Sequence, residues 1–304
     1  MNHIDEKISK NLNPTNEKPI IGILPYELRY SANLESLDIK KLVFPLAQPD
    51  HRMEKVADLR SFDHLIVYCC WKSISRSYRK LKCNVDLLIA EPRAVQARYY
   101  FLIPFIASKF RFILTHSTRL ISKIHNGIFH SSATLWVDSK YPISKKFLIS
   151  IIASSKKKTE GQRLRHEIIK VCKAKKLEVD FFGSAYKKID RKEEALADYM
   201  FSVCIENSSD DGYFSEKLMD CFALKSIPIY WGAPNIGDYF DINGIIFCKS
   251  AEEILSAIHN VNLDLYRDRL ESIEYNYKLV QNIKSTEHIA ASKITLLIDE
   301  KNEN

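Results

Sequence analysis

Residues 205–232 read IENSSDDGYFSEKLMDCFALKSIPIYWG and contain the most informative pattern of the 304-residue chain. An apolar run ends at Ile205, a loop of small and acidic residues follows, and a second apolar run covers 227–231. Ser215 is a favourable N-cap residue, so we expect a helix to begin there and to continue to Leu224. This stretch therefore predicts a strand, a loop, a helix and a second strand.

The start of the predicted helix is suited to an anionic ligand. A helix N-terminus has unpaired backbone N–H groups and a partial positive charge, and Lys217 adds a full charge there. Glu206 and Asn207 follow the first strand, where their polar groups could orient sugar or ribose hydroxyls, and Tyr213 could contact a nucleotide. The plainer alternatives are a solvated lysine on a capped helix and a turn-forming asparagine.

Apolar strands alternate with helical patterns along most of the chain. Strands are expected at 20–24, 64–69, 85–90, 111–115, 147–153, 179–182, 201–205, 227–231 and 244–247, and helices at 73–81, 96–108 and 160–176 among others. Such a pattern favours parallel sheets covered on both faces. Polar residues and Pro142 interrupt it at 137–142. We therefore expect a disordered tail at 1–18, an N-terminal domain at 19–140, and a C-terminal domain at 141–298 that ends in helices.

Composition argues against nucleic-acid binding and favours a cytoplasmic location. The net charge is +7, but no recognition helix or zinc-finger spacing accompanies the basic residues, so nucleic-acid binding is not expected. Seven cysteines form no CxxC pair and several lie in apolar runs, which predicts buried, reduced thiols in a cytoplasmic protein. The longest apolar run, 99–114, contains Lys109 and Arg111 and is too short to span a membrane, which leaves peripheral membrane association open.

The order E-N, G-Y, S-E-K-L and I-P-I-Y-W-G resembles the donor-binding motif of glycosyltransferase family 10, the α-1,3/1,4-fucosyltransferases, and above all their bacterial members. The family pattern usually reads F-E-N-S/T and Y-x-T-E-K, where this chain has Ile205 and Ser215 in place of Phe and Thr. Weaker similarity extends to GQRLR at 161–165 and to the strand that precedes Glu91 and Pro92. The resemblance covers roughly 85–249 and is strong only within 206–232.

The resemblance implies an α/β fold of the GT-B type, with two facing Rossmann-like domains and a cleft between them. It implies inverting transfer of L-fucose from GDP-fucose to a hydroxyl of a glycan acceptor, in surface polysaccharide biosynthesis or protein glycosylation. Glu91 would be the catalytic base, with Glu27 in reserve. The donor-binding residues would be Arg165, Glu206, Asn207, Tyr213, Glu216 and Lys217, with Arg163 as the alternative to Arg165.

Three questions stay open at this point. Another nucleotide sugar would suit the same helix start, and a non-catalytic nucleotide- or carbohydrate-binding protein would need no base. Asp210-Asp211 is similar to the DxD motif of metal-dependent transferases, although a solvated turn is favoured, so we expect no required cofactor and a divalent metal that at most stimulates. The acceptor glycan and the linkage cannot be identified from the residues.

Overall fold

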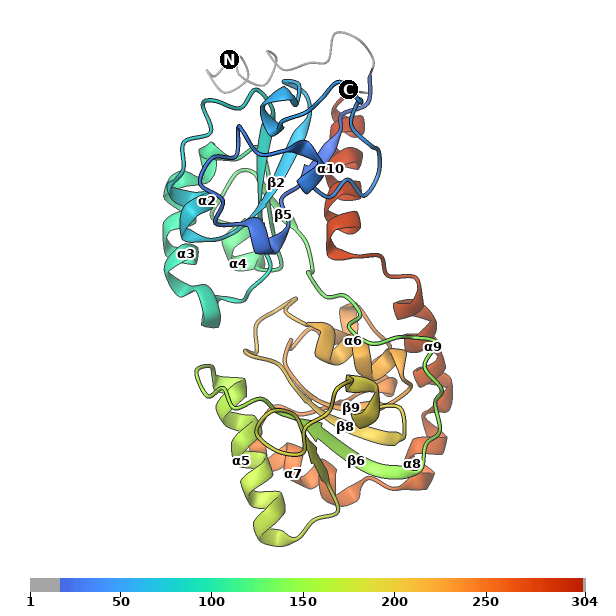
Figure 1. Cartoon of the computed structure of the whole chain (residues 1–304). Coiled ribbons are helices and arrows are strands. Elements are labelled where there is room, and N and C mark those ends of the chain that lie inside the picture. Colours follow the sequence, from blue (N-terminus) through green and yellow to red (C-terminus); the bar gives the residue numbers. More distant parts are fainter. Residues whose placement is uncertain (1–16, 303–304) are drawn as a thin grey trace. The chain divides into compact units, whose positions relative to one another are not determined.

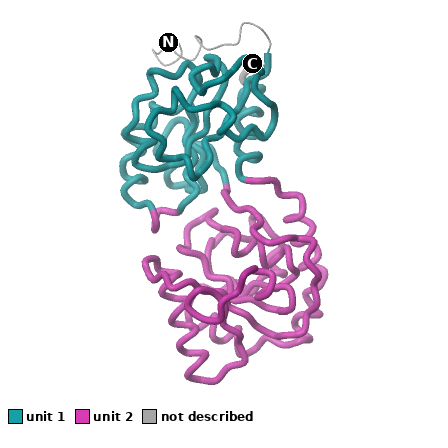
Figure 2. The backbone as a smooth tube through the Cα atoms, in the orientation of Figure 1, with its two compact units in different colours: residues 1–91, 96–130, 286–304 teal, residues 92–95, 131–285 magenta. Residues whose placement is uncertain are grey.

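The computed structural model describes residues 17–302, which form helices and strands joined by short loops (Figure 1). The chain divides into two compact units (Figure 2). Unit 1 contains the residues up to 91, then 96–130, and the residues from 286 onward. Unit 2 contains 92–95 and 131–285. Most of the predicted tail at 1–18 lies outside the described residues.

Unit 1 is built on a parallel sheet whose strands follow one another in chain order, β1-β2-β3-β4-β5. The strands are β1 (Ile21–Ile23), β2 (His64–Tyr68), β3 (Asn84–Ile89), β4 (Ile113–Thr115) and β5 (Gly127–Phe129). The helices are α2 (Trp71–Ser75), α3 (Arg93–Ile106), α4 (Thr118–Ile121) and α10 (Thr286–Asn302).

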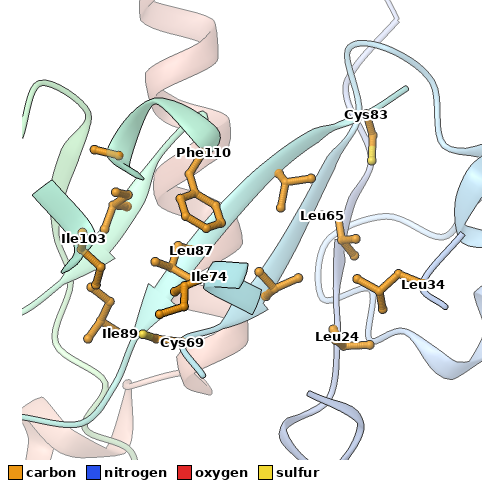
Figure 3. Packing of buried hydrophobic residues seen from close by; sticks show 14 of the residues in the cluster. Leu24, Leu34, Leu65, Cys69, Ile74, Cys83, Leu87, Ile89, Ile103 and Phe110 are labelled. Carbon is orange, nitrogen blue, oxygen red and sulfur yellow. The ribbon is translucent and has the colours of Figure 1, made fainter. Parts of the chain in front are cut away.

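The strand order of unit 1 explains why the chain returns to it. Right-handed crossovers between strands laid down in one direction place the connecting helices on the same face of the sheet. Ile74 of α2 and Ile103 of α3 accordingly pack with Leu87 and Ile89 in one core cluster (Figure 3). The opposite face would be bare without α10, whose buried residues pack in a separate cluster with β1, β2 and β3.

Unit 2 is a second parallel sheet with the order β10-β9-β8-β6-β7. The strands are β6 (Phe147–Ile152), β7 (Asp180–Phe182), β8 (Tyr199–Ile205), β9 (Ile227–Trp231) and β10 (Ile246–Phe247). The helices are α5 (Glu160–Lys175), α6 (Glu216–Ala223), α7 (Ala251–Asn260), α8 (Leu263–Asp268) and α9 (Leu270–Gln281). Buried residues of α5 and α7 share one core cluster, while those of α6 and α9 share another.

Short 3-10 helices complete the described structure. They are η1 (Tyr26–Leu28), η2 (Ile39–Lys41), η3 (Val56–Asp58), η4 (Ala107–Lys109), η5 (Lys192–Ala195), η6 (Ile236–Asp238) and η7 (Ile242–Gly244). No helix within 17–302 is both long enough and apolar enough to cross a membrane. All seven cysteines are free and buried, as predicted.

Three predictions of organisation need correction. The boundary lies at 130/131 rather than at 140/141, because Ala133 and Val137 pack in a core cluster of unit 2. The last helix, α10, belongs to unit 1 and not to the C-terminal domain. The helix expected at 73–81 ends at Ser75, because Arg76 is extended at φ −68°, ψ 147° and its guanidinium bonds the carbonyls of Ser31 and Ala32. The nine predicted strands are present, and β5, a three-residue edge strand, was not predicted.

Candidate functional site

The topology of unit 2 marks one position on its sheet. β6 and β8 are neighbours, and the helices that follow them, α5 and α6, pack on opposite faces. Ligands of doubly wound sheets bind at such a switch point, beyond the carboxyl ends of the two strands. The decisive stretch of the sequence contains one of these ends, since β8 stops at Ile205 and α6 begins at Glu216.

A glycine brings α5 against the end of β8. The Gly161 N–H donates a hydrogen bond of 3.3 Å to the carbonyl oxygen of Asn207. A Cβ atom on Gly161 would lie only 1.7 Å from the carbonyl oxygen of Glu206, so a residue with a side chain requires the backbone to move. Thr159 caps α5 through a capping box with Gln162, which fixes where the helix begins.

Glu206 fixes the start of α6. Its side chain has no exposed surface. One carboxylate oxygen accepts the Ser215 N–H at 2.8 Å and the other accepts the Ser215 hydroxyl at 2.7 Å. Ser215 is the N-cap, as predicted, and accepts the Lys217 N–H at 3.4 Å. Because the chain itself occupies both oxygens of Glu206, the contacts of this residue favour a positioning role over the direct ligand contact that we expected.

Lys217 lies between two carboxylates. Its Nζ is 3.0 Å from Oε1 of Glu216 and 3.6 Å from Oε2 of Glu206. Burial lowers the pKa of Lys217, but the charges of Glu206 and Glu216 outweigh it, so the pKa lies above its usual value. Burial raises the pKa of Glu216, but Lys217 and Lys192 more than reverse that effect. Lys217 is therefore a fixed cation at the start of α6, and Glu216 is a carboxylate.

Arg165 provides a second cation from α5. Only 6% of its surface is exposed, and its Nη2 donates a hydrogen bond of 3.0 Å to Oδ1 of Asn207. Its buried Nε has no hydrogen-bond partner among the described residues. Burial lowers the pKa of Arg165, whereas the charge of Glu206 raises it. A desolvated guanidinium with an unused donor is suited to an anionic ligand.

The remaining predicted donor residues lie in the same cluster. The Tyr213 hydroxyl is 3.5 Å from Nδ2 of Asn207, and the tyrosine ring is buried rather than available for open stacking. Arg163 is exposed, and its guanidinium donates to the carbonyl of Lys158, so the structure favours Arg165 of the two arginines. The structure thus brings together Arg165, Glu206, Asn207, Tyr213, Glu216 and Lys217.

Two charged residues of the site were not predicted. Asp220 of α6 is buried and pairs with Lys192 at 2.6 Å, and it accepts the Trp136 N–H at 2.8 Å. Lys192 also lowers the pKa of Glu216. The available signal was an acid four residues after Glu216, on the same face of an otherwise apolar helix.

Asp210 and Asp211 lie in an exposed turn. Oδ2 of Asp210 accepts the Ser208 hydroxyl at 2.8 Å, and the Asp210 carbonyl accepts the Tyr213 N–H at 3.1 Å. Gly212 follows with a positive φ of 70°, a conformation that glycine adopts without strain. This geometry agrees with the turn that the sequence favoured.

The predicted base belongs to unit 1. Glu91 follows β3, and its carbonyl accepts the Tyr100 hydroxyl at 3.0 Å. Burial raises the pKa of Tyr26; the charge of Arg29 opposes that rise and the carboxylate of Glu91 adds to it. Glu27, the reserve candidate, lies in η1 just beyond β1. Both acids therefore follow the carboxyl ends of strands of the unit 1 sheet.

Comparison with known proteins finds a family that is similar to the part of unit 2 that contains Arg165 and Lys217. Residues 143–246 match the model of the glycosyltransferase family 10 (fucosyltransferase) C-terminal domain. The matched residues include Arg165, Asn207 and Lys217. The α-(1,3)-fucosyltransferase FucT of Helicobacter pylori is 30% identical over 118 residues, which are 36% of this chain and 25% of that protein. The GDP-fucose protein O-fucosyltransferase 3 of Homo sapiens is 25% identical over 139 residues, 41% of this chain and 28% of the relative. The chain thus spans about a quarter of the length of these relatives.

Solved structures confirm the GT-B fold class. A glycosyltransferase from Rickettsia africae has a TM-score of 0.53 at 12% identity, covering 77% of this chain and 76% of that one. The pneumococcal O-GlcNAc transferase GtfA has a TM-score of 0.51 at 16% identity, covering 79% of this chain and 58% of its own. At these identities the likeness concerns the fold alone.

The close approach at Gly161 generates a prediction about stability. We expect Gly161→Ala to lower the free energy of unfolding by about 1–3 kcal/mol, because the added methyl group displaces α5 from the end of β8. Urea denaturation measures this change. Gly237→Ala is the matched control, since a Cβ there meets its nearest atom at an ordinary 3.8 Å. Equal stability of the two variants would show that α5 can move without cost.

Proposed function

We propose that this chain is a fucosyltransferase that transfers L-fucose from GDP-fucose to a hydroxyl of a glycan acceptor, with inversion at the anomeric carbon. The observation that carries the proposal is the convergence of two cations, the buried Arg165 and the partly buried Lys217, at a switch point within the residues that match the family 10 domain model. Fucosyl transfer, with GDP-fucose as donor, is named for relatives of this chain.

The cation cluster suits a nucleoside diphosphate as the leaving group. Breaking the bond between fucose C1 and the β-phosphate oxygen leaves the electron pair on GDP, whose diphosphate then gains negative charge. Fixed cations stabilise that charge without reorganising, which lowers the barrier. Arg165 offers an unused N–H donor, and Lys217 is fixed by Glu206 and Glu216. The start of α6 adds its partial positive charge.

Inverting transfer also needs a base. The acceptor oxygen attacks C1 from the side opposite the diphosphate, a new C1–O bond forms, and the hydroxyl proton passes to a carboxylate. We assign this role to Glu91, which lies between the end of β3 and Pro92. Glu27 also follows the carboxyl end of a unit 1 strand, so its substitution is the comparison for that of Glu91.

Two alternative functions, transfer from another nucleotide sugar and binding without catalysis, can each be distinguished from fucosyl transfer by experiment. Another nucleotide sugar would use the same cations, so GDP-fucose, GDP-mannose and UDP-sugars must be compared side by side. A non-catalytic binding protein would bind GDP but show no turnover with any acceptor. The cytoplasmic compartment and a role in surface polysaccharide or protein glycosylation remain predictions from the sequence.

The first prediction concerns the leaving group. We expect Lys217→Ala and Arg165→Ala each to weaken GDP binding by about 10- to 100-fold, the usual contribution of one hydrogen bond to a charged group. Titration calorimetry measures the affinity, and thermal denaturation checks that each variant is folded. Arg163→Ala on the same helix and Lys249→Ala, an exposed lysine of unit 2, are the controls. Unchanged affinity in both site variants would move the donor site away from the switch point.

The second prediction concerns metal dependence. We propose that no divalent metal is required, because the helix start and two cations already supply positive charge to the diphosphate. Turnover should persist in EDTA, and Asp210→Asn with Asp211→Asn should leave it within about threefold. Complete loss of turnover in EDTA, restored by Mn²⁺, would instead identify the two aspartates as candidate ligands.

The third prediction concerns the base and the stereochemistry. Glu91→Gln should retain GDP affinity while transfer slows by about 10²- to 10⁴-fold, the usual effect of losing a general base. Glu27→Gln should have a much smaller effect. Proton NMR of the product reads its anomeric configuration in the same reactions. Near wild-type transfer by Glu91→Gln would reassign the base, and a product of retained configuration would rule out inversion.

A further inference from the structure

Two segments of unit 1 contain basic residues and no acidic residue. Residues 71–83 contain five lysines or arginines, and residues 96–130 also contain five. Neither segment contains an aspartate or glutamate. The segments include α2, α3 and α4, which lie on the same side of the unit 1 sheet (Figure 1). Positive charge is therefore concentrated on that side of unit 1.

The same side exposes large aromatic side chains. Phe101 and Phe105 of α3 are 69% and 74% exposed, and their ring centroids are 5.7 Å apart. Trp71 at the start of α2 is 54% exposed. Phe101 and Phe105 are one helical turn apart, so they form a stripe on the outer face of α3, opposite the buried Tyr100 and Ile103.

Basic groups join the two helices next to these rings. The Arg98 guanidinium lies 5.5 Å from the centroid of the Trp71 ring, three residues before Phe101 on α3. At the other end of α2, the Lys109 ammonium donates to the carbonyl of Ile74 at 2.8 Å. We call the surface formed by Trp71, Arg98, Phe101 and Phe105 the α2–α3 face. One lysine of the 71–83 segment faces an acid from another part of unit 1, since Lys80 pairs with Glu35 at 3.2 Å. The charge next to the exposed rings comes from Arg98.

We propose that the α2–α3 face binds the surface of a membrane that contains anionic lipids. Phenylalanine and tryptophan rings enter the boundary between headgroups and acyl chains, while lysines and arginines bind the anionic headgroups. The face combines both features, because aromatic rings project from segments that carry only positive charge. This binding is a property of unit 1 and does not depend on the proposed transfer reaction.

The charge distribution argues against two other occupants. A second copy of the chain would bring one pair of segments with a net positive charge against another, and like charges repel. Nucleic acid would account for the basic residues, but it gives no role to a Phe101–Phe105 pair on a helix with no polar group between the two rings. A lipid surface accounts for the aromatic and the basic residues together.

The test measures binding of the full chain to phosphatidylcholine vesicles with and without phosphatidylglycerol, by co-sedimentation. We expect binding only to the anionic vesicles, with affinity that falls as salt is added. Phe101→Ser with Phe105→Ser should reduce the affinity at least about tenfold, because two inserted rings are lost. Leu270→Ser with Tyr275→Ser on α9 is the matched control, since these residues are 48% and 57% exposed.

A second pair of variants separates charge from apolar contact. Lys72→Gln, next to Trp71 on α2, with Arg98→Gln should weaken binding about 25-fold, from about fivefold for each charge near an anionic surface. Lys156→Gln with Lys157→Gln, in an exposed loop of unit 2, should leave it unchanged. GDP affinity should be the same in all four double variants, so this test stands apart from that of the donor site. Equal vesicle binding by every variant, or binding to a DNA duplex without binding to anionic vesicles, would overturn the proposal.

Discussion

The buried carboxylate of Glu206 is the group on which the candidate site depends. It lies at the end of β8 and accepts two hydrogen bonds from Ser215, so the strand end and the start of α6 are held at a fixed separation. The same carboxylate lies 3.6 Å from the Lys217 ammonium, which raises the pKa of that lysine against the effect of burial. A lysine in the first turn is unfavourable beside the helix dipole. Glu206 and Glu216 offset that cost and keep the cation in place.

Sheet topology distributes the roles between the two units. In unit 2 the order in which strands are added to the sheet reverses between β6 and β8, so α5 and α6 pack on opposite faces. The carboxyl ends of β6 and β8 are therefore available to a ligand. Unit 1 has no such change among its described strands, and its helices α2, α3 and α4 share one face. Its acids Glu27 and Glu91 instead follow the carboxyl ends of β1 and β3. The second face of this sheet is covered by α10, which comes after all of unit 2 in the sequence.

Much of the fold could be predicted from the sequence, because long apolar strands and capped helices leave local signals. The N-cap at Ser215 and the helix after it are examples, and so is the capped helix α5. The pairing of Asp220 with Lys192 could not be predicted, since it joins residues 28 positions apart that no local pattern relates. The role of Glu206 was also missed, because sequence shows that an acid follows a strand but not that the next helix occupies both of its oxygens. The position of α10 could not be predicted either, because α10 covers the face of the unit 1 sheet that the crossover helices leave open. Which face that is depends on the order of all the strands in the sheet.

The position of α10 also constrains the order in which the protein can fold during synthesis. Unit 1 needs residues 286–302 to cover Ile66, Leu88 and Leu114, which lie on the second face of its sheet. All of 131–285, the larger part of unit 2, is made between the last strand of unit 1 and that helix. A nascent chain on the ribosome can therefore complete the second unit while the first still exposes an apolar sheet face. Domains usually fold in order from the N-terminus. Here the packing of α10 allows unit 2 to be completed before unit 1. The intermediate most exposed to aggregation is a chain that still lacks residues 286–302.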